Sequence, residues 1–379
     1  MLTRRPAFAR FAHTAAIALV VCPAFATASS AQPMPAAAAP ATRYDYGAAV
    51  DSARRVARAI LEDNQLPGLS LAIGVDSRIV HSEGFGFANL ENRVPVSPST
   101  RMRIGSISKP VTAAAMALLV DRGRLDLDAE IQQYVPDFPA KRWPITVRQV
   151  AGHIAGIRHY RADENLSARR YATVMDGLAI FADDSLLFEP GTDYSYSSYG
   201  WNLLSAVVEG AAGVPFLEFM RREVFEPLGL RSIVAEHTDS ILEWRSDFYE
   251  RGDDGRLLRA PYVDNSFKWA GGGFISNTED LVRFAFAHLD GEFLKPETVA
   301  ELWTDQRTRS GEETNYGIGW RSERDEAGRN IVSHTGGSVG GRAVLIIYPA
   351  ERVVVAMASN GGHAPMSVEN ARAIAALFF

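Results

Sequence analysis

The chain has 379 residues, of which 47% are hydrophobic and 10% aromatic, and a formal net charge of −6. This is the composition of a globular protein with enough apolar material for a large core. An acidic chain without basic clusters argues against nucleic acid or an anionic membrane surface as a partner.

Residues 1–31 have the composition of a secretory signal. Their start is basic and free of acids, 15–26 is an apolar stretch, and Ala26-Thr27-Ala28 offers a cleavage site. We therefore expect an exported protein, periplasmic or secreted, with a mitochondrial location as the alternative. The apolar stretch is too short for a stable membrane span. Residues 32–44 are expected to be a flexible linker, and the single cysteine, Cys22, falls within the signal, so we expect neither a disulfide nor thiol chemistry.

The next part of the chain predicts a helix, a hairpin and a buried helix. Residues 46–62 repeat apolar side chains at helical spacing. Residues 69–75 and 79–86 lie on either side of a turn signal at 76–78 and predict paired strands. Residues 111–120 are apolar on nearly all sides, so we expect this helix to be buried.

The middle of the chain, from about 200 to 300, has a mostly helical pattern. Helices are predicted over 201–210 and 215–225. Ser276 and Glu279 have the spacing of a capping box and predict that a further helix begins there.

The last part of the chain returns to strands. Runs at 331–332, 343–348 and 352–358 predict strands, and 367–379 predicts a closing helix. Strands at both ends thus flank a helical middle. We predict an α+β fold in which one antiparallel sheet, built from both chain ends, carries the terminal helices and adjoins an inserted all-α lobe.

The expected domain limits follow from this division. We place one domain at 45–379, with a sheet lobe formed by 45–100 and 310–379 and a helical lobe formed by 101–309. A small-molecule or peptide substrate would bind in the cleft between the lobes. The sequence leaves the oligomeric state open.

Ser106 and Lys109 stand at the start of the apolar helix and form the first candidate site. Their spacing puts both side chains on one face of a helix, and N–H groups at a helix N-terminus favour developing negative charge. The chain has only four lysines, and a lysine that enters a buried helix needs a reason. In the structural alternative, Ser106 caps the helix and Lys109 is solvated.

Two further stretches add candidates. Tyr196 lies among alternating tyrosines and serines, and a tyrosine beside a cationic lysine can lose its proton and act as a base for a serine. His334 and Thr335 stand at the end of a predicted strand, where they would line a cleft. The backbone N–H groups of Gly336 or Gly337 are available to an oxyanion there. The structural alternatives are packed tyrosines and a glycine-rich hairpin turn.

Two other patterns predict different chemistry less well. Residues 336–340 fit the Gly-x-Ser-x-Gly form of a nucleophile elbow, but that motif needs a helix after it and here a strand follows. His153 and His159 suggest a metal, yet no His-Glu-x-x-His pattern or carboxylate cluster accompanies them. We therefore expect neither a metal nor a cofactor.

Together, the stretches around Ser106, Tyr196 and His334 resemble the serine β-lactamase and penicillin-binding protein superfamily. Within it, they are most similar to the branch of class C β-lactamases, D-alanyl-D-alanine carboxypeptidases, D-aminopeptidases and related esterases. The mitochondrial β-lactamase-like family is also near, because it shares the Ser-Ile-Ser-Lys form seen here at 106–109. The resemblance covers about 45–379.

This resemblance implies a role for each motif. Ser106 would be the acylated nucleophile, and Lys109 its proton acceptor or the charge that activates Tyr196. Tyr196 would be the general base of acylation and would help to activate water in deacylation. His334 stands where many members have lysine or histidine. The N–H groups of Ser106 and Gly337 would form the oxyanion hole.

One position departs from the family pattern. The second motif of the family is Tyr-x-Asn, whose asparagine contacts the amide side chain of the substrate, and Ser198 stands in its place. The shorter hydroxyl favours ester or peptide substrates over β-lactams. The sequence leaves open whether Arg342 binds a substrate carboxylate.

The predicted function is that of an exported serine hydrolase that forms an acyl-enzyme at Ser106. Within that class we expect a β-lactamase-related peptidase, amidase or esterase. The alternatives are a true class C-like β-lactamase or D,D-carboxypeptidase and, from another class, a non-catalytic penicillin-binding-like or scaffold protein.

Overall fold

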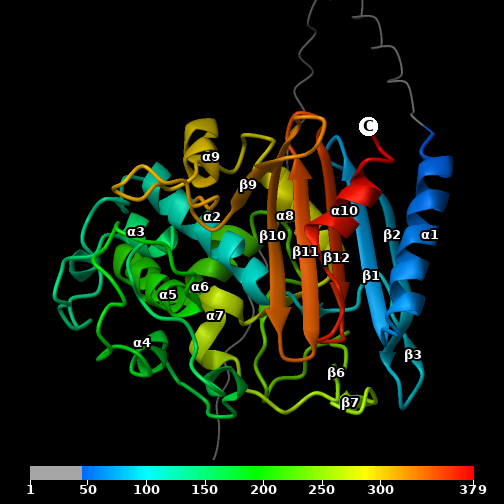
Figure 1. Ribbon diagram of the computed structural model, residues 1–379, viewed down its shortest axis with the longest axis horizontal. Coiled ribbons are helices and arrows are strands. Elements are labelled where there is room, and N and C mark those ends of the chain that lie inside the picture. The colour runs from blue at the N-terminus through cyan, green and yellow to red at the C-terminus, as the bar shows by residue number, and fades with distance from the viewer. Residues whose placement is uncertain (1–44) are drawn as a thin grey trace, which may run out of the picture. The chain divides into compact units, whose positions relative to one another are not determined.

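A seven-stranded antiparallel sheet, in the order β3-β2-β1-β12-β11-β10-β9, organises residues 45–379, which are the residues that the computed structural model describes (Figure 1). Its strands come from both ends of this range, and β1 pairs directly with β12. The prediction of one antiparallel sheet built from distant parts of the chain is confirmed. The expected signal (1–31) and linker (32–44) lie outside the described residues.

Tight turns join neighbouring strands of this sheet. Between β1 and β2, Asp76 and Ser77 both have positive φ angles, of 48° and 61°, as a hairpin turn of the I′ type requires. The strands are β1 (Gly68–Val75), β2 (Arg78–Asn89), β3 (Val94–Pro95), β9 (Arg321–Arg324), β10 (Asn330–Ser338), β11 (Gly341–Tyr348) and β12 (Val353–Ser359).

Helices cover both faces of the sheet. α1 (Gly47–Asp63) and α10 (Val368–Ala375) pack on one face, and α8 (Thr278–Ala287) packs on the other (Figure 1). Side chains of β1 alternate between the two layers, since Leu71 packs in the cluster with α1 and α10, whereas Ala72 packs in the cluster with α8. Burial on both faces explains why β1 is apolar along its whole length except at Ser70.

The start of α8 differs from the prediction. Its N-cap is Asn277, whose side chain accepts a hydrogen bond from the N–H of Asp280, and not Ser276, which ends β8 (Phe274–Ser276). Serine and asparagine both cap helices well, so the sequence allowed two starts one residue apart.

α8 also packs on β1 and β12, although it lies within 101–309, where a helical lobe is predicted. The lobe limits stay a prediction.

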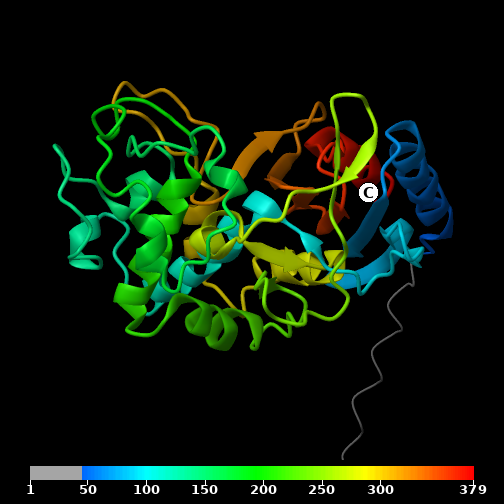
Figure 2. The ribbon, with the colours of Figure 1, turned by 90° about the horizontal axis from the view of Figure 1, so that it is seen from below.

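The other helices gather beside the β9 and β10 side of the sheet (Figures 1 and 2). The helix predicted over 201–210 begins earlier, at Ser198, and the one predicted over 215–225 is divided into a short α-helix and a π-helical segment, Met220–Phe225. The helices are α2 (Ser108–Asp121), α3 (Val147–Ala151), α4 (Val174–Leu178), α5 (Ser198–Ala212), α6 (Phe216–Phe219), α7 (Trp269–Gly272) and α9 (Pro296–Trp303), and η1 (Gly105–Ile107), η2 (Ile131–Gln133), η3 (Glu164–Leu166) and η5 (Ser266–Lys268) are 3-10 turns.

No single helix in the described part of the chain is long and apolar enough to cross a membrane. The bent pair of α5 with Phe216–Phe225 meets the length and composition of a span, but only across a bend of 73°.

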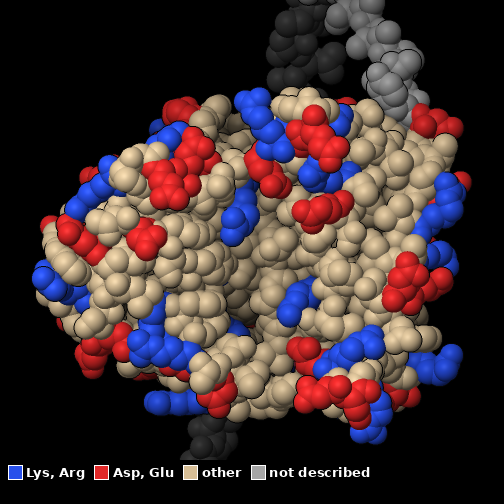
Figure 3. All heavy atoms as spheres, viewed as in Figure 1, with Lys and Arg blue, Asp and Glu red and all other residues tan. Residues whose placement is uncertain are grey.

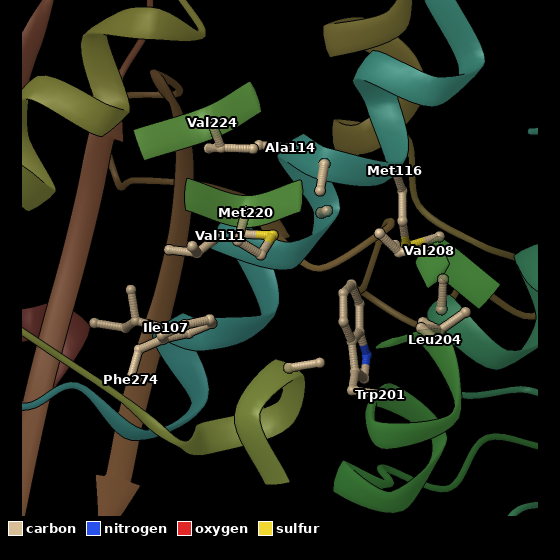
Figure 4. Close-up of a cluster of buried hydrophobic side chains, with 14 of the residues drawn as sticks. Ile107, Val111, Ala114, Met116, Trp201, Leu204, Val208, Met220, Val224 and Phe274 are labelled. Carbon is tan, nitrogen blue, oxygen red and sulfur yellow. The ribbon is translucent and has the colours of Figure 1, made fainter. Parts of the chain in front are cut away.

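α2 is buried on all sides, as its sequence predicts. Every residue from Ser108 to Leu119 is buried. Val111, Ala114 and Met116 lie among side chains of α5 and of Met220–Phe225 in the cluster that Figure 4 shows. Because α2 cannot shift without disturbing this packing, its N-terminus holds the candidate site in a fixed position.

The middle of the chain contains more strand than predicted. β4 (Met102–Arg103), β8 and β5 (Val234–Ala235) form a second, three-stranded sheet, and β6 (Tyr249–Arg251) pairs with β7 (Leu257–Arg259). Strands of two or three residues are too short to show an alternating pattern. The middle of the chain is therefore mostly helical, as predicted, but it also holds these short strands, which the sequence analysis did not predict.

Candidate active site

A cleft of about 440 Å³ lies between the helices and the β10–β11 hairpin, and Ser106 lines it. Figure 3 shows this hollow with Lys or Arg atoms at its border. Its polar lining includes Ser106, Tyr196, Ser198, Lys268, Gly337 and Arg342. His334, Thr335 and Gly336, which were expected to line the cleft, are not part of this lining.

Ser106 is held where η1 meets α2. The preceding Gly105 has a φ of +50°, a conformation that favours glycine. A Cβ at Gly105 would lie 2.6 Å from the backbone nitrogen of Gly337, so the close approach of η1 to β10 also requires glycine. This backbone places the half-buried Ser106 beside β10 with its side chain at the cleft.

Lys109 is completely buried. Its Nζ lies 3.0 Å from Oγ of Ser106, 3.0 Å from Oγ of Ser198 and 2.7 Å from the carbonyl oxygen of Gly271. None of these three partners is a carboxylate. Lys109 is therefore not the solvated lysine of the structural alternative.

These surroundings favour a neutral amine. Burial lowers the pKa of Lys109 well below its usual value, and the charge of Lys268 lowers it further. A neutral amine offers two N–H donors and one lone pair. The carbonyl of Gly271 can only accept, and the hydroxyl of Ser198 can accept the second N–H. The lone pair is then left for the hydroxyl proton of Ser106.

Tyr196 completes the group around Ser106. Its ring lies 4.8 Å from Nζ of Lys109. Burial raises the pKa of the Tyr196 phenol, and a hydrogen bond with the Ser106 side chain partly opposes this. Since the pKa of Lys109 is lowered while that of Tyr196 is raised, a neutral phenol and a neutral amine are favoured over a tyrosinate and an ammonium. Of the two roles left open for Lys109, this favours direct proton acceptance.

Two histidines hold the first turn of α5. Nδ1 of His153 accepts from the N–H of Ser197, and Nδ1 of His159 accepts from the N–H of Ser198, each at 3.1 Å. Burial lowers the pKa of both rings, that of His159 to about 4. His153 has a φ of +63°, and such strain in a residue other than glycine concentrates near functional sites. Among residues 45–379, no cluster of His, Cys, Asp or Glu is suited to a metal ion.

The N–H of Gly337 points toward the space beside Ser106. In the β10–β11 hairpin, Gly337 pairs with Arg342, next to the pair that closes the two-residue turn. Because hydrogen-bonded and non-hydrogen-bonded pairs alternate in an antiparallel ladder, the N–H of Gly337 faces away from β11. β9 pairs with β10 only as far as Ser333, so η1 lies against the open edge. This geometry fits the predicted oxyanion hole, whose role stays a prediction.

Gly336 does not line the cleft, but it allows β10 and η1 to lie in contact. A Cβ at Gly336 would lie 1.8 Å from the carbonyl oxygen of Ile104, so no side chain fits between β10 and η1. Thr335, the neighbouring residue, is exposed to solvent.

His334 lies within β10 and behind Tyr196 rather than at Ser106. Its Nδ1 is 2.6 Å from the carbonyl oxygen of Thr335, which can only accept, so Nδ1 carries the proton. Its Nε2 therefore accepts from the hydroxyl of Tyr316, at 2.9 Å. Burial is the main cause that lowers the pKa of His334, to about 3. His334 is thus a neutral, fully hydrogen-bonded ring, and Tyr316 is a site residue that sequence reasoning missed.

Lys268 is a second residue that sequence reasoning missed. It ends η5, is buried, and lines the cleft. The available signal was the scarcity of lysine, because two of the four lysines in the chain, Lys109 and Lys268, are buried here.

Arg342 also lines the cleft. Its Nη1 donates to the carbonyl oxygens of Ser338 and Gly341, at 3.0 and 3.1 Å.

This fold and this grouping of serine, lysine and tyrosine match one class of proteins. A family model described as beta-lactamase matches residues 53–378, and the chain therefore belongs to the beta-lactamase family, within its serine beta-lactamase-like and penicillin-binding-protein-like branch. The superfamily and branch predicted from the motifs are confirmed.

Two relatives and one solved structure illustrate the likeness. The human mitochondrial serine beta-lactamase-like protein LACTB is 32% identical over 411 aligned positions, which cover 84% of this chain and 75% of that protein. A penicillin-binding protein of Bacillus subtilis (strain 168) is 27% identical and covers 79% of this chain and 69% of its own length. The octameric penicillin-binding protein homologue from Pyrococcus abyssi has a TM-score of 0.75 at 25% identity, covering 86% of this chain and 77% of that one.

Proposed function

We propose that residues 45–379 form a serine hydrolase that acts through an acyl-enzyme at Ser106 on ester, amide or peptide acyl donors. The observation that carries this proposal is the buried Nζ of Lys109, 3.0 Å from Oγ of Ser106 and without a carboxylate partner. A neutral amine beside a hydroxyl is the arrangement of an activated nucleophile and its base.

In the proposed acylation, Oγ of Ser106 attacks the carbonyl carbon while its proton moves to Nζ of Lys109. The N–H groups of Ser106 and Gly337 bind the oxyanion, and one such donor contributes about 10²–10³ in rate. Lys109 then returns the proton through the phenol of Tyr196 to the leaving alcohol or amine, which departs. Water then attacks the Ser106 ester and gives its proton to the same pair. The pair passes this proton to Oγ of Ser106 as the bond between the acyl carbon and Oγ breaks, which releases the acid.

A true β-lactamase or D,D-carboxypeptidase is the second candidate. The human relative is named serine beta-lactamase-like, and the Bacillus relative is named a penicillin-binding protein. Against this candidate, the Ser198 hydroxyl is bound to Lys109, so no side-chain amide reaches into the cleft from this position. We therefore favour open-chain esters, amides or peptides.

The choice between these substrates is tested by comparing kcat/KM for a cephalosporin, a D-amino-acid amide and a short-chain ester. We expect the ester or the amide to be preferred. A cephalosporin value near ~10⁶ M⁻¹s⁻¹, within the usual range of enzymes, would reverse this preference.

The role of Ser106 is tested with Ser106→Ala and 4-nitrophenyl butyrate. We expect hydrolysis to fall by about 10⁴-fold or more, because removing a nucleophile removes the acyl-enzyme route. Ser240→Ala, at an exposed serine outside the cleft lining, is the matched control. Intact-protein mass spectrometry after exposure to an acyl-donor panel should show added mass at Ser106. Full activity in folded Ser106→Ala would refute the proposal, and a folded protein that is never labelled would favour the non-catalytic alternative.

For its location we propose export, on the basis of residues 1–31. The name of the human relative places that protein in the mitochondrion, which is the alternative. Expression of the full chain in a Gram-negative host should give a periplasmic product whose N-terminus falls at about residues 29–32. A cytoplasmic product that retains residues 1–31 would contradict export.

A further inference from the structure

Lys268 presents a buried positive charge to the cleft beside Ser106. Only 4% of the residue is exposed, yet it belongs to the cleft lining. Among residues 45–379, its Nζ makes no hydrogen bond and no ion pair. The contacts of Nζ are instead with the rings of Tyr160 and Phe267, whose centroids are 5.8 and 5.3 Å away.

The nearby acid does not neutralise this charge. Glu236 is the acid that acts on Lys268, but its oxygens are already engaged. They accept from Nε and Nη2 of Arg103 at 2.7 and 2.9 Å and from Nδ2 of Asn265 at 2.6 Å. The Arg103–Glu236 pair is thus closed on itself. Among the described residues, Lys268 remains a buried cation without an oxygen partner, which is costly unless a ligand supplies one.

The other charged residues of the lining leave a positive balance. Arg342 is a second cation, held at the hairpin through its Nη1. Glu250 is the acid of the lining, and its Oε1 accepts from the N–H of Gly340 at 2.6 Å. Two cations therefore face one carboxylate that already has a backbone partner.

We propose that Lys268 is an anion-binding residue of this cleft and that the acyl donors of the protein carry a carboxylate that pairs with it. This proposal rests on the proposed function, because it assigns a substrate class to the same site. An ammonium and a carboxylate form a strong charge-assisted hydrogen bond, and an uncharged substrate leaves the buried ammonium of Lys268 unpaired. Discrimination against uncharged analogues follows from that difference.

The test uses two matched pairs of chromogenic esters, so that the carboxylate is offered on either side of the scissile bond. For the acyl side, 4-nitrophenyl hydrogen adipate is compared with methyl 4-nitrophenyl adipate. For the leaving-group side, 3-carboxy-4-nitrophenyl butyrate is compared with 4-nitrophenyl butyrate. In each pair, the ratio of kcat/KM for the anionic ester to that for the neutral ester is measured for the wild type, Lys268→Met, Lys268→Arg and the exposed control Lys295→Met.

In at least one pair, we expect Lys268→Met to lower this ratio by about 10- to 100-fold, the usual effect of losing a hydrogen bond to a charged group. Loss of the Lys268 charge also acts on the pKa of Lys109, but that effect is common to both esters of a pair and cancels in the ratio. Lys268→Arg should restore most of the ratio, and Lys295→Met should match the wild type. The proposal is overturned if neither pair shows a Lys268-dependent ratio, or if Lys268→Met lowers both esters of each pair by the same factor.

A measurement on the wild type alone keeps the proposal testable if Lys268→Met does not fold. Burial and Arg103 lower the pKa of Lys268, Glu236 opposes them, and the result is a pKa of about 8. The ammonium is present below this pH and lost above it, so the preference for the anionic ester should fall between pH 7 and 9. The ionisable groups around Lys268 are Lys109, His159, Tyr160, Arg103 and Glu236. If one of these groups changes the rate of the chemical step with pH, it changes the rate for both esters, so the effect cancels in the ratio of their kcat/KM values.

Failure of the proposed function would look different. In that case, neutral esters would be hydrolysed equally well by Ser106→Ala. Hydrolysis of neutral esters that depends on Ser106 but shows no charge preference would overturn only the assignment of Lys268.

Discussion

Replacing Lys109 by methionine removes the amine, nearly keeps the length of the side chain, and tests whether the amine is neutral in the folded protein. Burial lowers the pKa of Lys109 in the fold, whereas an unfolded lysine titrates near ~10.4. Between these two pKa values, the unfolded chain binds one proton more than the folded chain. The free energy of unfolding of the wild type therefore rises with pH, by about 1.4 kcal/mol per pH unit for a full proton.

Methionine has no such proton, so the difference in unfolding free energy, wild type minus Lys109→Met, should rise with pH at about this slope. The rise begins above the folded pKa of Lys109 and ends near ~10.4. Urea unfolding at pH 7, 8 and 9, followed by the fluorescence of the six tryptophans, measures it. Lys268 also titrates in this range, but it is present in both proteins and cancels to first order.

Lys295→Met is the control, because Lys295 is exposed and its difference from the wild type should not change with pH. We also expect Lys109→Met to lower ester hydrolysis by about 10²–10⁴-fold, the usual contribution of a positioned base. A difference for Lys109→Met as flat as that of the control would refute the reasoning. Lys109 would then be charged in the fold, and Tyr196 would be the base of Ser106.

Two more substitutions test the support around the site. Gly336→Ala places a Cβ 1.8 Å from the carbonyl oxygen of Ile104, so β10 must move away from η1. Ester hydrolysis should then fall by about 10²–10³-fold, because an oxyanion donor is displaced. Unchanged kinetics would show that the donor lies elsewhere. Tyr316→Phe removes the hydroxyl that donates to Nε2 of His334, so the free energy of unfolding by urea should fall by about 1–3 kcal/mol, and an unaltered midpoint would contradict this hydrogen bond.

Much of the fold could be predicted because its signals lie between neighbouring residues. The apolar run after Lys109 predicted a buried helix, and Ser108 to Leu119 are buried. The turn residues between 69–75 and 79–86 predicted the first hairpin, which Asp76 and Ser77 form. Strands of two or three residues, such as Val234–Ala235, were missed because they depend on partners distant in the chain.

The candidate site was predicted in part for the same reason. Ser106 and Lys109 are three residues apart, so helical spacing alone brings them together. His334 was expected to line the cleft, but its ring is turned to Tyr316. Ser198 was expected to meet the substrate, but its hydroxyl reaches Lys109. The orientation of a side chain depends on which hydrogen-bond partner the fold brings near, and spacing in the sequence does not record it.

By itself, then, the sequence determined the pairing of Ser106 with Lys109, the apolar helix behind them and the antiparallel sheet built from distant segments. These features follow from helical and strand periodicity, which is local. Only the tertiary structure decided the charge state that the lysine favours, because desolvation depends on what packs around it. Gly271, which accepts from Lys109, lies 162 residues further along the chain. Lys268, from the same segment, adds the positive charge that lowers the pKa of Lys109 further.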